Sequence, residues 1–162
     1  MLVVSDTSPL TALLQIGRDS LLTILFGRVL VPSAVNDELL RFHASLPEYL
    51  EIQAIYDHGA ADALSRNLDR GEAEAIVLAE ECHADYLLMD EKLGRSVAQS
   101  RGLRVIGLLG ILVIAKTAGR IESVGSVIEE LETKARFFVS ESVKQIILRA
   151  AGEDWHLPPG SN

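Results

Sequence analysis

Two short apolar segments of the chain each end at an aspartate. The valine-rich residues 1–5 precede Asp6, and residues 87–89 precede Asp90. Short apolar segments of this kind, each followed by a helical pattern, predict β-strands in strand–helix units. Because strands and helices alternate along the chain, we expect an α/β fold in which helices cover both sides of a central parallel sheet.

The same patterns predict the other elements. We expect strands at 2–5, 28–31, 50–55, 86–89 and 104–106. We expect helices at about 9–14, 19–26, from Pro32 past Glu38, and at 60–68, 71–82, 91–101, 108–117, 123–136 and 141–150. In the first helix, Ser8 is the predicted N-cap and Pro9 the first helical residue. A chain of 162 residues suits one domain, over residues 1–150, followed by a disordered tail at 151–162.

Composition restricts the classes of function. The net charge of −8 argues against a broadly basic nucleic-acid binder, although a metal in an acidic site would supply local positive charge. The apolar run at 105–115 is shorter than the ~20 residues of a membrane-spanning helix, so no membrane association is expected. The N-terminus lacks the pattern of an export signal. The single cysteine, Cys82, excludes an intramolecular disulfide and is typical of the cytoplasm.

Asp6 and Asp90 define the predicted site. Parallel strands end at one edge of a sheet, where ligands bind in the crevice, so both aspartates should line that crevice. Carboxylates gathered there repel one another unless a cation is present, and oxygen ligands favour Mg²⁺ or Mn²⁺ over zinc. The ordinary alternatives are a cap or turn role for Asp6, a task that Ser8 already serves, and a helix cap for Asp90. The four histidines show no zinc-ligand spacing, and no glycine-rich nucleotide loop is present.

Two glutamates on predicted helices are further candidates. Glu38 borders a predicted buried stripe of Val35, Leu39 and Phe42, where a solvated flank residue is equally possible. Glu72 lies on the same helical face as the apolar residues that follow it, whereas Glu74 lies roughly opposite.

Glu72 has an ordinary alternative as a carboxylate at a helix N-terminus, worth ~0.3–1 kcal/mol. That role does not explain its inward direction, so Glu72 is preferred to Glu74 as a site residue. Gly71 permits a tight turn into the helix. Lys92 and Arg95, after Asp90, could contact phosphate or pair with the neighbouring acids.

Four blocks of sequence resemble one family, the PIN-domain ribonucleases, whose fold is that of VapC-type toxins. The blocks are Val-Val-Ser-Asp-Thr-Ser at 3–8, Val-Pro-Ser-Ala-Val-Asn-Asp-Glu-Leu at 31–39, Gly-Glu-Ala-Glu-Ala-Ile at 71–76, and Leu-Leu-Met-Asp-Glu-Lys-Leu-Gly-Arg at 87–95, with Gly-Leu-Arg-Val-Ile-Gly at 102–107 behind them. They cover about residues 1–150 in order. The combination is similar to a less characterised nucleic-acid-binding subfamily.

The resemblance implies a three-layer α/β/α fold, hydrolysis of RNA with Mg²⁺ or Mn²⁺, a homodimer, and inhibition by a small antitoxin protein. It maps the family's acidic positions, as catalytic residues and metal ligands, onto Asp6, Glu38, Glu72 and Asp90. A small hydroxyl position would be Thr7 or Ser8. The chain departs from the family pattern where Glu72 replaces an aspartate and where residues 93–95 replace a further acid. Those departures leave open whether one metal or two are bound.

The sequence therefore predicts a cytoplasmic, metal-dependent endoribonuclease, the toxin of a type II toxin–antitoxin pair. The alternative is a catalytically weak module of the same fold that binds RNA or the antitoxin. A phosphotransfer enzyme of the haloacid-dehalogenase type would need a second aspartate where Ser8 stands, and a receiver domain would need an acidic pair beside the first strand.

Overall fold

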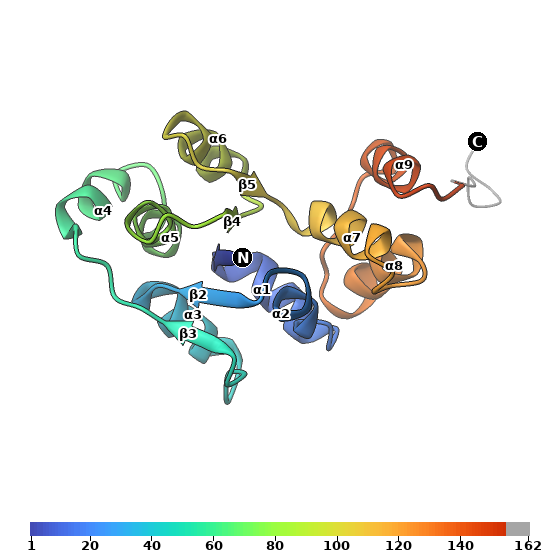
Figure 1. Cartoon of the computed structure of the whole chain (residues 1–162), viewed down its shortest axis with the longest axis horizontal. Helices are drawn as coiled ribbons and strands as arrows, with labels where there is room; N and C mark the ends of the chain where they lie inside the picture. The colour runs from blue at the N-terminus through green and yellow to red at the C-terminus, as the bar shows by residue number, and fades with distance from the viewer. Residues whose placement is uncertain (155–162) are drawn as a thin grey trace. The chain divides into compact units, whose positions relative to one another are not determined.

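The computed structural model describes residues 1–154 (Figure 1). Short strands alternate with helices from the first residues onward. The elements are β1 (Leu2–Ser5), α1 (Thr7–Gln15), α2 (Ser20–Phe26), β2 (Arg28–Val31), α3 (Ser33–Phe42), β3 (Leu50–Ile52), α4 (His58–Leu64), α5 (Arg70–Glu81), β4 (Tyr86–Leu88), α6 (Lys92–Ser100), β5 (Val105–Ile106), α7 (Leu108–Thr117), α8 (Val124–Lys134) and α9 (Glu141–Ala150).

The five strands form one parallel sheet in the order β3-β2-β1-β4-β5. Valines and leucines fill the central strands, and Val4, Leu30 and Leu87 are almost fully buried. Burial on both faces explains why these strands are apolar runs and not alternating patterns. The predicted three-layer α/β/α fold with a central parallel sheet is confirmed.

The sheet order places a switch point at the centre. From β1 the chain moves outward to β2 and β3, and it then returns through α4 and α5 to β4 on the other side of β1. The connections that follow β1 and β4 run in opposite directions along the sheet. The carboxyl ends of these two strands are therefore the position at which α/β sheets form a ligand crevice. Helix α5 contacts both of these strands and also α3, α4 and α6. Figure 1 shows α5 beside α4, both in green.

The contacts within the chain divide it into two units. Met1–Leu108 contains the whole sheet and α1 to α6, and a second unit begins at Leu109. In the second unit, Glu153 accepts hydrogen bonds from the backbone N–H groups of Val124 (2.6 Å) and Gly125 (3.0 Å) at the start of α8. Residues 151–154 of the predicted tail belong to the described structure, and residues 155–162 lie outside the described residues.

Several local predictions differ from the structure. Helix α1 begins at Thr7, so Asp6 and not Ser8 occupies its N-cap position. Phe42 was predicted to be buried, but it is the last residue of α3 and its surface is 72% exposed. The periodicity of α3 continues to that residue, whereas the helix ends there and leaves the ring without a covering element. None of the helices in residues 1–154 is long and apolar enough to cross a membrane.

Candidate functional site

Asp6 and Asp90 both lie at the switch point of the sheet. Ser5 pairs with Leu88 at the ends of β1 and β4, and the Asp6 backbone N–H donates to the Leu88 carbonyl oxygen at 2.9 Å. Asp6 directly follows β1, and Asp90 comes two residues after β4. The structure therefore brings the ends of two strands, separated by more than 80 positions, to the same edge, as the sequence predicts for parallel strands.

Asp6 is buried among other carboxyl groups. Only 4% of its surface is exposed, and its side chain makes no capping hydrogen bond to α1 although it occupies the N-cap position. Burial, together with the negative charges of Asp69, Glu72 and Glu38, raises the pKa of Asp6 to about 7 against the opposing effect of the Thr7 backbone N–H. A carboxyl group with this pKa is about half protonated near neutral pH, because both burial and the neighbouring acids disfavour its charged form.

Glu38 extends from α3 towards Thr7, which donates a hydrogen bond to it, and towards Gly71, which leaves space for its carboxylate. The Thr7 hydroxyl donates to Glu38 Oε2 at 2.5 Å, which identifies Thr7, and not the exposed Ser8, as the hydroxyl beside the first acid. A Cβ atom at Gly71 would lie 2.8 Å from Glu38 Oε1. Gly71 does not have a positive φ, so the expected turn role is wrong: the missing side chain makes room for the Glu38 carboxylate.

Glu72 is also a capping residue. Its Oε2 accepts the Asp69 backbone N–H at 3.1 Å, while Asp69 Oδ1 accepts the Glu72 backbone N–H at 2.8 Å. This reciprocal pair is a capping box. Glu72 therefore has a structural role at the N-terminus of α5, in addition to its predicted role in the site. Glu72 is nevertheless only 6% exposed, and burial, together with Asp69, Glu91 and Glu38, raises its pKa against the opposing effect of the Asp69 backbone N–H.

Asp69 is a site residue that the sequence interpretation missed. It adds charge beside both Asp6 and Glu72. The spacing Asp-x-x-Glu before a helix is the signature of a capping box and would have identified it.

Glu74 does not point away from the core as the helical spacing suggested. It is 6% exposed, as buried as Glu72, and lies 3.7 Å from Arg70 Nε. The argument from spacing assumed a helix covered on one side. Helix α5 is instead surrounded by two strands and three helices, so its residues 71–79 are all buried.

Asp90 has different neighbours. Its Oδ1 accepts the Leu108 backbone N–H at 3.1 Å, and its Oδ2 is buried without a hydrogen-bond partner among the described residues. Asp90 does not cap α6, whose N-cap residue is Glu91. Burial raises the pKa of Asp90, while the Leu108 N–H and the charge of Arg95 lower it.

The four predicted residues thus fall into two sets. The charges of Glu38 and Glu72 act on Asp6, whereas the groups that act on Asp90 are the Leu108 N–H and Arg95. In residues 1–154, no three His, Cys, Asp or Glu side chains are close enough together to hold a metal ion. A metal held by these groups would therefore require side chains such as Glu38 and Glu72 to rearrange from their present hydrogen bonds.

The donor set fits a hard divalent cation. All the candidate ligands are carboxylate oxygens. Asp90 Oδ2 is buried and has no hydrogen-bond partner within the part of the chain that the structure describes, and Gly71 leaves a space that a side chain would fill beside Glu38. Oxygen donors of this kind suit Mg²⁺ or Mn²⁺.

Comparison with known proteins yields one relationship. A family model described as a PIN domain matches residues 2–153. No curated protein and no solved structure matches the chain.

Proposed function

The chain belongs to the PIN-domain family, and from this premise we propose that it is a metal-dependent endoribonuclease that hydrolyses phosphodiester bonds of RNA. The family has a nuclease-type fold. The single observation that carries the proposal is the burial of Asp6 beside Glu38, Glu72 and Asp69 at the switch point of the sheet, which raises its pKa to about 7. A structural role alone does not explain a buried group that the surrounding charges disfavour.

Each side chain has a specific task in this mechanism. Asp6, Glu38 and Glu72 would hold Mg²⁺ or Mn²⁺, with Asp90 completing the site from β4. Thr7 orients Glu38 by its hydrogen bond, and Asp69 fixes the start of the helix that carries Glu72. Asp6 would act as a ligand in its deprotonated form. A divalent ion bound here supplies an activated water and stabilises the charge of the leaving oxygen, so no side-chain nucleophile is required.

Cleavage of a mixed structured RNA tests this proposal. The purified protein is assayed with Mn²⁺, with Mg²⁺ and with EDTA. Wild-type protein should cut with a metal and not with EDTA. Asp6→Asn should reduce the rate at least about a hundredfold, because even residues that only support metal ligands contribute 10–100-fold.

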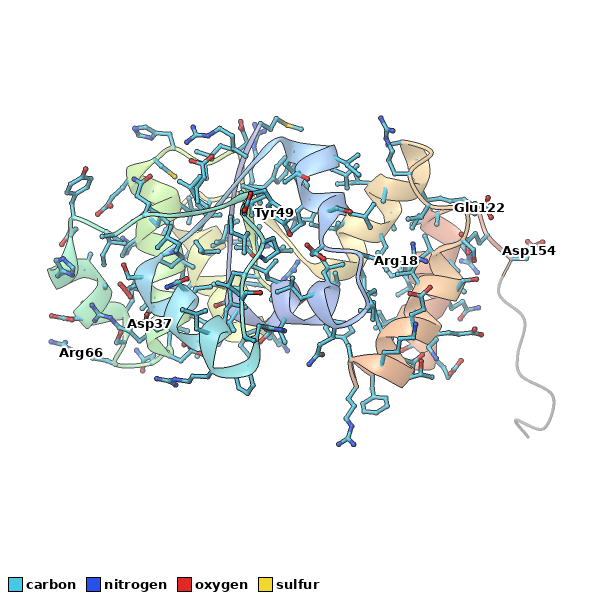
Figure 2. The ribbon with its side chains drawn as sticks, turned by 90° about the horizontal axis from the view of Figure 1, so that it is seen from below. Arg18, Asp37, Tyr49, Arg66, Glu122 and Asp154 are labelled. Atoms are coloured by element: carbon cyan, nitrogen blue, oxygen red, sulfur yellow. The ribbon has the colours of Figure 1, made fainter. Side chains whose placement is uncertain are left out.

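Asp37→Asn is the matched control. Asp37, labelled in Figure 2, precedes Glu38 on α3 and is exposed. The same change of charge there should leave the rate within about twofold. Equal cleavage by the wild-type protein and Asp6→Asn would refute the site assignment.

A catalytically weak binding module is the second candidate function. The capping box occupies one oxygen of Glu72, and Arg95 lies beside Asp90, so a metal would find fewer free ligands than four acids suggest. Folded wild-type protein that binds RNA but does not cut it with either metal would favour this candidate.

We also propose that the protein is the toxin of a toxin–antitoxin pair, a cytoplasmic homodimer that a small antitoxin inhibits. The acidity of the site and the net charge of −8 suggest that the inhibitor contributes basic side chains. Replacing Glu38 or Glu72 by glutamine should therefore weaken the complex with a co-expressed antitoxin. Unchanged affinity in both variants would contradict this.

A further inference from the structure

A guanidinium group is fixed beside Asp90 at the carboxyl ends of β4 and β5. Arg95 Nη1 donates to the backbone carbonyl oxygen of Met89 at 3.0 Å. Met89 is the residue between β4 and Asp90. Because Arg95 on α6 is half-buried and hydrogen bonded to the main chain, its position is set by the sheet and not by another side chain.

Arg95 and Asp90 both lie close to Gly107. A Cβ atom at this position would lie 2.6 Å from Arg95 Nη1 and 2.8 Å from Asp90 Oδ1. Any other residue would displace one of the two groups. Glycine therefore allows the cation and the carboxylate to approach the same point.

Neutralisation of Asp90 does not account for this arrangement. An arginine that served only as a counter-ion would donate to Asp90 Oδ2, which is buried and has no hydrogen-bond partner in residues 1–154. Arg95 donates to a carbonyl oxygen instead. A guanidinium has five N–H donors, so others stay available to a ligand.

Arg95 borders the same crevice as the carboxylates. The preceding residue, Gly94, has a Cβ position 3.7 Å from the Glu72 carboxyl carbon. Adjacent residues of α6 therefore lie near two of the candidate acids: Gly94 lies near Glu72, and the Arg95 side chain lies near Asp90.

We propose that Arg95 binds a phosphate group of the RNA strand at the Asp90 end of the crevice. This rests on the proposed function, since it assigns a substrate contact within the same site. A chain with a net charge of −8 and a crevice lined by carboxylates repels a polyanion. A planar guanidinium with free donors supplies the local attraction and matches the geometry of phosphate oxygens.

Binding of a fluorescently labelled single-stranded RNA tests the inference. Fluorescence anisotropy is measured with Ca²⁺, which takes the same oxygen ligands, over a series of salt concentrations. Arg95→Gln should raise Kd at least about tenfold and reduce the slope of log K against log salt by about 0.7, the value for one lost phosphate contact on a single strand. The Kd of Arg95→Lys should lie between those of the wild-type protein and Arg95→Gln, because lysine keeps the positive charge but lacks the planar guanidinium.

Arg104→Gln is the matched control. Arg104 is exposed at the opposite end of β5, and its replacement should change neither Kd by more than about twofold nor the slope. The melting temperature of each variant is measured in parallel. An Arg95→Gln protein with wild-type Kd and slope would overturn the inference. A loss of binding that accompanies a fall in melting temperature, and that Arg95→Lys does not relieve, would overturn it too, as would wild-type protein that binds no RNA.

The two proposals fail in different ways. Metal-dependent cleavage with an unchanged KM in Arg95→Gln refutes the phosphate contact and leaves the nuclease intact. Binding that depends on Arg95, without cleavage by the wild-type protein, refutes the nuclease and leaves the phosphate contact intact.

Discussion

The carboxylates at the two ends of the crevice, Asp6 at one end and Asp90 at the other, have different neighbours. At one end, Asp6 is buried beside Glu38 and Glu72, and these neighbouring charges raise its pKa. At the other end, burial also raises the pKa of Asp90, but the Leu108 backbone N–H and the charge of Arg95 oppose that rise. The first end gathers several acidic side chains, whereas the second places a carboxylate near a guanidinium. The difference suggests that metal binding centres on Asp6 and that the Asp90 end faces the substrate.

The largest expected effect is on the stability of the metal-free protein. Asp6 has a folded-state pKa of about 7 against an ordinary value of 3.8. Its protonated form therefore stabilises the fold fully below about pH 4, and this stabilisation is lost as the pH rises through 7. Asparagine resembles the protonated form, so Asp6→Asn should be more stable than the wild-type protein in EDTA at pH 8, by up to about 4 kcal/mol.

Thermal unfolding between pH 5 and pH 8 measures this difference. The melting temperatures of the two proteins should converge at the acidic end and separate at the basic end. Parallel curves over the whole range would mean that Asp6 is not held at a raised pKa.

A second test compares the two buried glutamates of α5. Glu72→Gln removes the charge but retains a side chain that suits a capping box. It should weaken Mn²⁺ binding by about tenfold or more without lowering the melting temperature, because its carboxylate lies beside Asp6. Glu74→Gln loses only a 3.7 Å ion pair with Arg70, so Mn²⁺ affinity should change less than about threefold. If a Mn²⁺ titration showed a larger loss of affinity for Glu74→Gln than for Glu72→Gln, Glu74 would be the ligand instead.

The smallest effects should come from adding one methyl group at each end. Gly71→Ala would press on the Glu38 carboxylate, and Gly107→Ala would press on Arg95 and Asp90. Gly71→Ala should reduce the affinity for Mn²⁺ several-fold, on the order of 1 kcal/mol or less, the scale of a displaced hydrogen bond. Gly107→Ala should leave Mn²⁺ affinity closer to wild type and reduce affinity for RNA. If the two substitutions changed the affinities for Mn²⁺ and for RNA equally, the proposed difference between the Asp6 end and the Asp90 end would be wrong.

Much of the fold can be predicted from the sequence because burial leaves a local pattern. The parallel strands are apolar runs, and Asp6 and Asp90 interrupt such runs at the points where the strands end. Parallel pairing then brings them to one edge without any knowledge of side-chain contacts. The boundaries of α7 and α9 also agree with their periodicity.

The details of the site depend on contacts that no local pattern contains. Glu74 was misplaced because a helical stripe indicates one buried side, and α5 is covered on all sides. Arg95 and Asp90 come close to Gly107 because β4 pairs with β5 and because Gly107 has no side chain. Gly107 is at least 12 positions away from both residues, so no local pattern contains this contact. Asp69 is different, since its spacing before Glu72 was readable as a capping box.

Calorimetric titration with Mn²⁺ at pH 7 tests the central claim most directly. Titrations in two buffers with different enthalpies of ionisation give both the affinity and the number of protons released. If Asp6 is a ligand with a pKa of about 7, the wild-type protein should release about half a proton for each Mn²⁺ bound, since metal binding requires a deprotonated ligand. Asp6→Asn should bind much more weakly and release fewer protons. Equal affinity and equal proton release in the two proteins, or no binding by the wild type, would contradict the account.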